Sequence, residues 1–177
     1  LVVAYHRKEA DPGALIEALE RRGQFLMASL GPNEMLKAVF EEALDLRHRH
    51  YGPDDPGRGR LLFLYAKAHH VGGDYRTAEK LFREALDEQH QFPGDLVVTA
   101  HTLGELGPIL SFRREHVLAD SILREAAKLH EQIYGRSHPL TANVLSFLSL
   151  NLSSLDRLVE AEELQREALA IQRQHGG

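Results

Sequence analysis

Apolar and small residues recur along the chain with the spacing of one face of a helix. The clearest example lies in the last quarter, where two such stretches flank a break at 155–157. The first stretch comprises Ala142, Leu145, Leu148, Ser149 and Leu152. The second comprises Leu158, Ala161, Leu164, Ala168 and Ile171. Spacings of three and four residues place each set on one side of a helix, so the pattern predicts two helices joined by a tight turn.

A short motif indicates that this helix pair is repeated. It reads FEEAL at 40–44, FREAL at 82–86, LREAA at 123–127 and QREAL at 165–169. Its alanines are Ala43, Ala85, Ala126 and Ala168, which stand 42, 41 and 42 residues apart. Seven residues before them lie Leu36, Ala78, Ala119 and Ala161. A fixed period of this length is typical of a repeat protein, and small residues at fixed sites allow two helices to approach closely.

Glycine and proline mark the turns between the predicted helices. We expect Gly72 and Gly73 to end one helix and Asp74 to cap the next. A longer loop joins successive pairs, and it reads YGPDDPGRG at 51–59 and YGRSHPLTA at 134–142. Its glycine permits the positive φ that ends a helix, and Pro139 suits the first turn of the next helix. We expect Tyr134 to pack back on this join.

The loop and the motif together resemble the tetratricopeptide repeat of the 42-residue kind found in kinesin light chains. In that kind a YGxxHP loop precedes the first helix and EAE.L.REAL.I lies in the second, and residues 134–176 match this pattern nearly throughout. The resemblance implies an all-α fold, a right-handed superhelical α-solenoid of about four helix-turn-helix pairs, with His138 as a loop and capping residue. It places repeats at about 12–50, 57–91, 96–133 and 138–175 of a domain spanning 12–177, after an N-terminal extension or the end of a preceding helix at 1–11.

In such arrays the first helix of each pair lines a concave face. Carried over position by position, the resemblance implies a groove lined by Arg21, Phe25, Arg60, Phe63, Lys67, His70, His101, Ser111, Phe112, Asn143, Ser146 and Leu150. This set holds three fixed positive charges, two histidines and no carboxylate, in a chain of net charge −5. It favours a protein or peptide partner with acidic residues beside an apolar anchor. The alternative is that the cations are merely solvated and that some phenylalanines belong to the core between helices.

Other kinds of chemistry find little support. The chain has no cysteine, which excludes disulfides and thiolate sites, and its negative charge argues against general nucleic-acid binding. No apolar run is long enough to span a membrane. Its 11 histidines do not form converging helical ligand pairs, and neither a phosphate-binding loop nor a nucleophile-elbow motif is present. We therefore expect no metal site, no cofactor and no enzymatic activity, in a cytoplasmic protein.

Two local features leave alternatives open. Pro108 falls inside the predicted helix 97–112, beside Gly107, where it either bends the helix and widens the groove or is a tolerated local defect. The last helix presents an apolar face from Leu158 to Ile171 without a polar terminal element after it. We expect missing sequence or another subunit to cover this face, and we consider a homodimer formed through this helix.

The sequence thus predicts a protein–protein interaction scaffold whose concave groove binds a peptide segment of acidic character. The alternative is a regulatory or sensor module of a larger protein, which binds a short peptide or small ligand and controls an attached domain. An effector domain in the full-length gene would favour the second function.

Overall fold

The structure is a computed structural model that describes residues 11–30, 34–92 and 94–175; of the predicted extension at 1–11, residues 1–10 lie outside this description. Within these ranges the chain forms helices and no strands, which confirms the all-α prediction. The chain divides into two compact units, Leu1–Phe92 and Pro93–Gly177. Each unit contains two helix pairs, and each is described by itself.

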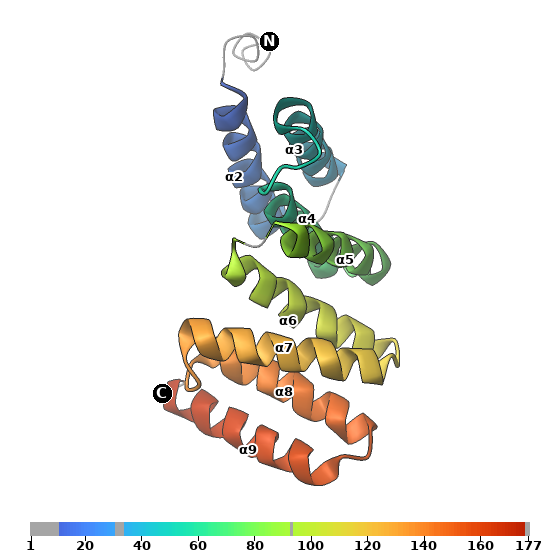
Figure 1. Ribbon diagram of the computed structural model, residues 1–177, viewed down its shortest axis with the longest axis vertical. Helices are drawn as coiled ribbons and strands as arrows, with labels where there is room; N and C mark the ends of the chain where they lie inside the picture. Colours follow the sequence, from blue (N-terminus) through green and yellow to red (C-terminus); the bar gives the residue numbers. More distant parts are fainter. Residues whose placement is uncertain (1–10, 31–33, 93, 176–177) are drawn as a thin grey trace. The chain divides into compact units, whose positions relative to one another are not determined.

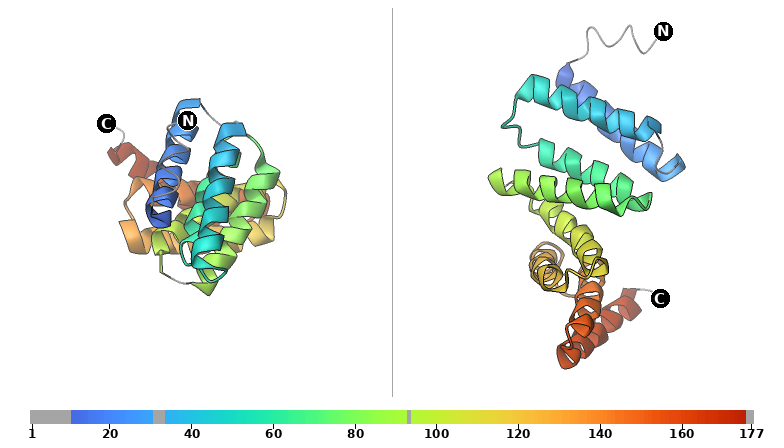
Figure 2. Two further views of the ribbon diagram at one scale, coloured as in Figure 1. Left: turned by 90° about the horizontal axis from the view of Figure 1, so that it is seen from above. Right: turned by 90° about the vertical axis from the view of Figure 1, so that its right-hand side faces the viewer.

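The first unit consists of α2 (Pro12–Leu30), α3 (Glu34–Tyr51), α4 (Arg58–Val71) and α5 (Tyr75–Gln91). Its helices pack in pairs, α2 beside α3 and α4 beside α5, as the right-hand view of Figure 2 shows. Gly23 lets α2 approach α3 closely, because a Cβ at this position would lie 2.7 Å from the Phe40 ring. Phe40 is fully buried and stacks on Tyr65 of α4 with ring centroids 5.4 Å apart, so the core continues from the first pair into the second.

The second unit consists of α6 (Leu96–Phe112), α7 (His116–Tyr134), α8 (Pro139–Ser154) and α9 (Leu158–His175). Helix α8 lies between α7 and α9 and contacts both (Figure 1). Helix α6 packs on α7, and Gly107 makes this contact possible, since a Cβ there would lie 2.5 Å from the Leu123 side chain. Pro108 lies inside α6, which continues as one helix to Phe112.

The residues at the repeated positions are buried between the helices. The four motif alanines are fully buried: Ala43, Ala85, Ala126 and Ala168. The residues seven positions earlier are buried as well: Leu36, Ala78, Ala119 and Ala161. Every member of the apolar stretch predicted for α8 is also buried. The repeated positions and this stretch therefore predict core residues correctly.

The tight turn within each of the last three pairs has one geometry but three different residues. The residue with positive φ is Gly73 (79°), Arg114 (66°) or Asp156 (59°). The next N–H donates to the carbonyl five residues earlier: Asp74 to His69 at 3.0 Å, Glu115 to Leu110 at 2.9 Å and Arg157 to Leu152 at 3.0 Å. This is the Schellman arrangement, in which a left-handed residue ends the helix. The sequence predicted it only at Gly72–Gly73, because the other two turns contain no glycine.

Side-chain caps open the helices at the predicted places. Asp74 accepts the Thr77 N–H at 3.2 Å, and the His138 Nδ1 accepts the Leu140 N–H at 3.2 Å. Pro139 is the first residue of α8, and Tyr134 stacks on His138 with ring centroids 4.9 Å apart. The loop glycines have positive φ, 83° at Gly52 and 89° at Gly135. The loop chemistry expected from the sequence is therefore confirmed.

Candidate interaction surfaces

In the first unit the predicted groove residues lie on α2 and α4, which contact each other. They are Arg21, Phe25, Arg60, Phe63, Lys67 and His70. Phe25 is 68% exposed, and Arg21 on α2 and Arg60 on α4 are exposed as well. Phe63 is buried instead, with its ring centroid 6.0 Å from that of Phe82, and so belongs to the core, as the alternative interpretation held for some phenylalanines. His70 is half-buried, with its ring centroid 5.4 Å from that of Tyr75 and 6.3 Å from that of Phe82. We call the other four residues, Arg21, Phe25, Arg60 and Lys67, the α2–α4 face.

Two carboxylates stand beside the cations of this face. The Arg21 guanidinium lies 3.9 Å from Glu17, and the Arg60 Nε lies 3.8 Å from Glu20. Burial raises the pKa of Glu20 above its ordinary value, while Arg47 and Arg60 oppose the shift. The charge of the α2–α4 face is therefore mixed, which the groove list taken from the sequence did not show.

A buried ion pair holds the loop that leads into α4. The Arg47 Nε and Nη2 donate to the two carboxylate oxygens of Asp55 at 2.6 and 2.8 Å, and the Gly57 N–H donates to the same carboxylate at 3.0 Å. Burial opposes ionisation of Asp55, but these hydrogen bonds outweigh it and hold the pKa of Asp55 below its ordinary value. The pair fixes where α4 begins and hence where Arg60 and Lys67 project.

In the second unit the predicted groove residues lie on α6 and α8, which also contact each other. They are His101, Ser111, Phe112, Asn143, Ser146 and Leu150, and we call them the α6–α8 face. Phe112 is 83% exposed and Leu150 is 63% exposed. These two large apolar side chains dominate the accessible surface of this face.

Three polar members of the α6–α8 face are engaged within the fold. The His101 Nε2 shares a hydrogen bond with the Tyr134 hydroxyl at 2.9 Å. The Ser146 hydroxyl donates to the Ala142 carbonyl at 3.1 Å, and the Asn143 Oδ1 accepts from Gln172 at 3.4 Å. These groups shape the helices around the exposed apolar residues.

A buried histidine lies behind His101. His130 of α7 bonds through Nε2 to the Ala100 carbonyl at 3.2 Å, and among the described residues its Nδ1 has no hydrogen-bond partner. Its ring centroid lies 5.5 Å from those of His101 and Tyr134. Burial lowers the pKa of His130 below its ordinary value, and nearby His101 and His138 add to the shift. The described residues contain no group of three or more side chains suited to holding a metal ion.

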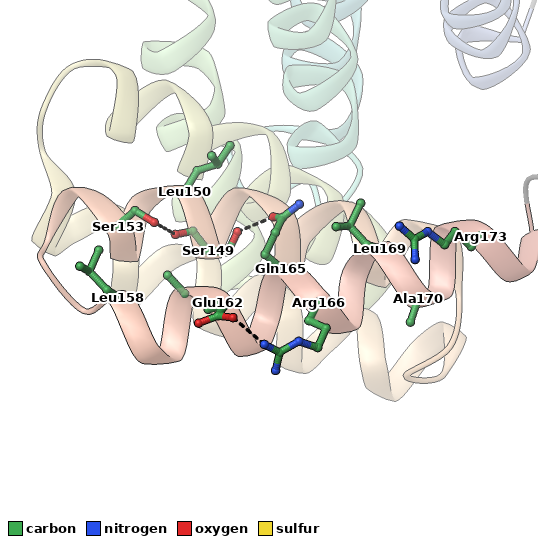
Figure 3. A pocket seen from close by; sticks show the side chains of 11 residues that line it. Ser149, Leu150, Ser153, Leu158, Glu162, Gln165, Arg166, Leu169, Ala170 and Arg173 are labelled. Atoms are coloured by element: carbon green, nitrogen blue, oxygen red, sulfur yellow. Dashed lines mark hydrogen bonds and ion pairs between the residues drawn. The ribbon is translucent and has the colours of Figure 1, made fainter.

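An open hollow of about 560 Å³ lies on α8 and α9 (Figure 3). It is lined by Ser149, Leu150, Ser153, Leu158, Ala161, Glu162, Gln165, Arg166, Leu169, Ala170 and Arg173. Its polar side chains bond to one another: the Ser149 hydroxyl donates to Gln165 at 2.7 Å, and Arg166 donates to Glu162 at 2.5 Å. Of the predicted groove residues, Leu150 is the member that lines it.

The structure corrects the expectation of one exposed apolar face along α9. Ala168 and Ile171 are buried in a cluster with Ala142 and Leu145 of α8. Leu158 and Leu169 are 62% and 40% exposed and line the hollow. The apolar face is thus divided, because α8 covers one side of α9 and leaves the other side accessible.

Comparison with known families decides what kind of array this is. The family model described as tetratricopeptide repeat matches residues 15–87 and 98–174, which together are more than half of the chain. The chain belongs to the tetratricopeptide repeat family. Tetratricopeptide repeats form non-catalytic scaffolds that generally mediate protein–protein interactions.

The comparisons also identify a similar sequence and similar solved structures. The chain is 26% identical over 150 residues to a clustered mitochondria protein homolog of Candida albicans, a match that covers 83% of the chain but only 11% of that relative's length. The crystal structure of BtubC (BKLC) from P. vanneervenii superposes with a TM-score of 0.78 at 22% identity, over 97% of this chain and 67% of the other. A kinesin light chain-type protein with nearly identical TPR-like repeats from Podosopora anserina gives a TM-score of 0.52 at 16% identity, over 99% and 93%.

These similarities support the fold of this tetratricopeptide repeat chain. They do not identify its binding partner. In the part of the chain that the structure covers, the helices fall short of the length and apolar character that a membrane span requires.

Proposed function

We propose that this tetratricopeptide repeat chain is an interaction scaffold that binds peptide segments on the first helices of its pairs. One observation carries the proposal: the exposed phenylalanines, Phe25, Phe112 and Phe147, all lie on the first helices α2, α6 and α8. The phenylalanines of the second helices, Phe40 and Phe82, are fully buried. Tyr51 and Tyr75 are exposed on second helices, so the asymmetry is specific to phenylalanine. Exposed phenylalanines gathered on the first helices support a binding site there, because aromatic anchors dominate the energy of peptide binding.

The α2–α4 face is suited to a segment with acidic residues. Arg21 lies one turn before Phe25 on α2, so Phe25 supplies an apolar contact next to this charge. Arg60 and Lys67 lie on α4, which contacts α2. The contact between Arg21 and Glu17 joins two side chains that are each 72% exposed at 3.9 Å. Such an exposed pair contributes little, so a peptide carboxylate could replace Glu17 at Arg21 with a small loss of internal energy.

A second candidate function is a regulatory or sensor module of a larger protein that binds a short peptide or small ligand. The match to the Candida albicans relative favours it, because the matched repeats make up 11% of that protein. In this arrangement the same faces would control an attached domain. A cytoplasmic location also stays a prediction.

Selection of peptides from a displayed library on the immobilised chain would test the scaffold function. We expect enriched peptides to carry Asp or Glu near an aromatic or aliphatic residue. The double variant Arg21→Glu with Lys67→Glu should weaken their binding, measured by calorimetry, by about tenfold or more, because two attractive charges become repulsive. The matched control is Lys37→Glu with Lys80→Glu, which makes the same change of net charge on the second helices α3 and α5.

An equal loss in the control would show that net charge alone weakens binding. Peptides without acidic residues, bound equally well by all variants, would contradict the acidic preference. If Phe25→Ala and Phe112→Ala also leave binding unchanged, the first helices are not the binding site.

We also propose that two copies of the chain associate through α9. The exposed apolar residues around the α8–α9 hollow, Leu150, Leu158 and Leu169, support this association, since apolar side chains gathered at one place favour contact with another protein surface.

A further inference from the structure

The accessible side of α9 carries a regular pattern of charged and apolar residues. Leu158, Glu162, Arg166, Leu169 and Arg173 follow one another at intervals of three or four residues and all line the α8–α9 hollow. This spacing places them in one stripe along the helix (Figure 3). The stripe therefore has an acidic and a basic residue, Glu162 and Arg166, between two leucines, and a second arginine, Arg173, at its C-terminal end.

The preceding repeat shows how such a stripe is covered. On α7, Asp120 and Arg124 occupy the positions 42 residues before Glu162 and Arg166, with the same signs of charge. The next pair bridges both of them: Arg157 lies 3.4 Å from Asp120, and Arg124 donates to Glu160 at 2.5 Å. Within the second unit the two charges on α7 are thus met by one cation, from the turn between α8 and α9, and by one anion, at the start of α9.

A second copy of α9 can supply the same two charges. When two identical helices pack antiparallel about a two-fold axis, residues at equal distances from the axis face each other. With the axis near Leu164, Glu162 faces the partner's Arg166, and Leu158 faces the partner's Ala170, beside the partner's Leu169. Glu162 and Arg166 of each copy are then matched by opposite charges, and the exposed leucines are removed from water. Arg173 lies beyond the start of the partner's α9 and takes no part in this pairing.

We infer that the outer side of α9 is a self-complementary interface, on which a second copy of this chain packs its own α9 antiparallel, with Glu162 and Arg166 paired across the two-fold axis. The inference rests on the proposed association through α9. It adds that the two α9 helices run antiparallel and that Glu162 of one copy pairs with Arg166 of the other. The ion pair within each helix remains in place, so four charges of alternating sign, Glu162 and Arg166 of each copy, meet around the axis.

Sedimentation equilibrium of the chain, from low micromolar to near-millimolar concentration, tests the inference. We expect the wild type to dimerise. Glu162→Arg and Arg166→Glu should each raise the dimer dissociation constant by about tenfold or more, because like charges then meet across the axis. An equimolar mixture of the two variants should dimerise again, since the basic stripe of one faces the acidic stripe of the other.

Matched controls change the same charges away from the stripe. Glu163→Arg lies on α9 outside the hollow and Lys128→Glu lies on α7, and both should dimerise as the wild type does. Circular dichroism melts would verify that each variant remains folded.

The outcomes separate the two levels of the proposal. A wild type that stays monomeric at all concentrations overturns both the association and the register. A dimer that is insensitive to either single charge reversal, or variants that fail to pair when mixed, overturns the register alone. A monomeric chain that instead captures an added helix from another protein would assign the stripe to a different partner and overturn the inference.

Discussion

At the scale of single residues, Arg114 and Asp156 hold a conformation that suits glycine. Both have positive φ at the end of a first helix, where Gly73 stands in the second pair. A side chain in this region crowds the following carbonyl and is unfavourable by about 1–2 kcal/mol. The helices still end there because the flanking hydrogen bond, from Glu115 or Arg157, satisfies a terminal carbonyl.

Arg114→Gly and Asp156→Gly should each stabilise the chain. Relief of the side-chain strain exceeds the added freedom of the unfolded chain, so we expect the free energy of unfolding to rise by about 0.5–1 kcal/mol for each change. Urea denaturation measures it. Ser121→Gly, at an exposed site inside α7, is the control and should lower stability by about 0.5–1 kcal/mol. If all three changes lowered the free energy of unfolding equally, the positive φ of Arg114 and Asp156 would not be a source of strain.

His130 should make stability depend on pH. Burial lowers the pKa of His130 in the folded chain below its ordinary value of 6.5. The unfolded chain therefore takes up the proton first as pH falls, and the free energy of unfolding decreases below about pH 6.5. Above that pH both states are neutral at this site and the contribution of His130 is constant. The decrease should continue down to the folded-state pKa.

His130→Gln should reduce this pH dependence. A glutamine can still donate a hydrogen bond toward the Ala100 carbonyl but does not titrate. The free energy of unfolding is measured between pH 7 and pH 5 for the wild type and for the variant. The difference between the two slopes isolates the contribution of His130. Identical slopes would show that His130 does not carry the effect.

At the scale of helices, the close contact of α6 and α7 depends on Gly107. A Cβ at Gly107 would lie 2.5 Å from two atoms of the fully buried Leu123 side chain. We expect Gly107→Ala to lower stability by about 1–3 kcal/mol, since the helices must move apart. At Gly104 of the same helix, a Cβ would meet its nearest neighbours at 3.5 and 3.6 Å, which is ordinary contact.

Gly104→Ala is therefore the matched control and should be neutral or stabilise the helix by up to about 1 kcal/mol. Thermal and urea unfolding of both variants measure the difference. If the two changes have the same effect, close packing does not explain Gly107.

Features that depend on neighbouring residues could be predicted from the sequence, whereas features that depend on contacts between helices could not. The Asp74 cap and the Pro139 start depend on residues within one turn, so their residue types predict them directly. The buried face of α8 follows from periodicity. Phe63 and Leu158 could not be assigned in this way, because packing between helices decides that the first is buried and the second exposed. The contact of Arg60 with Glu20 likewise joins two helices and depends on how α2 and α4 pack.

At the scale of the whole molecule, a chain of net charge −5 is proposed to bind acidic segments through local cations. Exposed ion pairs are screened by salt within a Debye length of about 8 Å at physiological ionic strength. We expect the affinity for an enriched acidic peptide to fall as sodium chloride is raised, measured by calorimetry. The Arg21→Glu with Lys67→Glu variant should not show this decrease, because salt there screens repulsion between the two new glutamates and the acidic peptide. A wild-type affinity that is unaffected by salt would indicate binding through apolar contacts alone.

The stripe on α9 also bears on how this chain could have grown. Its charges repeat those that join α7 to the following pair, and Glu162 and Arg166 stand one period after Asp120 and Arg124. A tandem duplication of the last 42 residues would bring new copies of Arg157 and Glu160 to the positions that match Glu162 and Arg166. The gene could thus gain a repeat in one step, with a compatible junction from the first generation and no need for later compensating mutations.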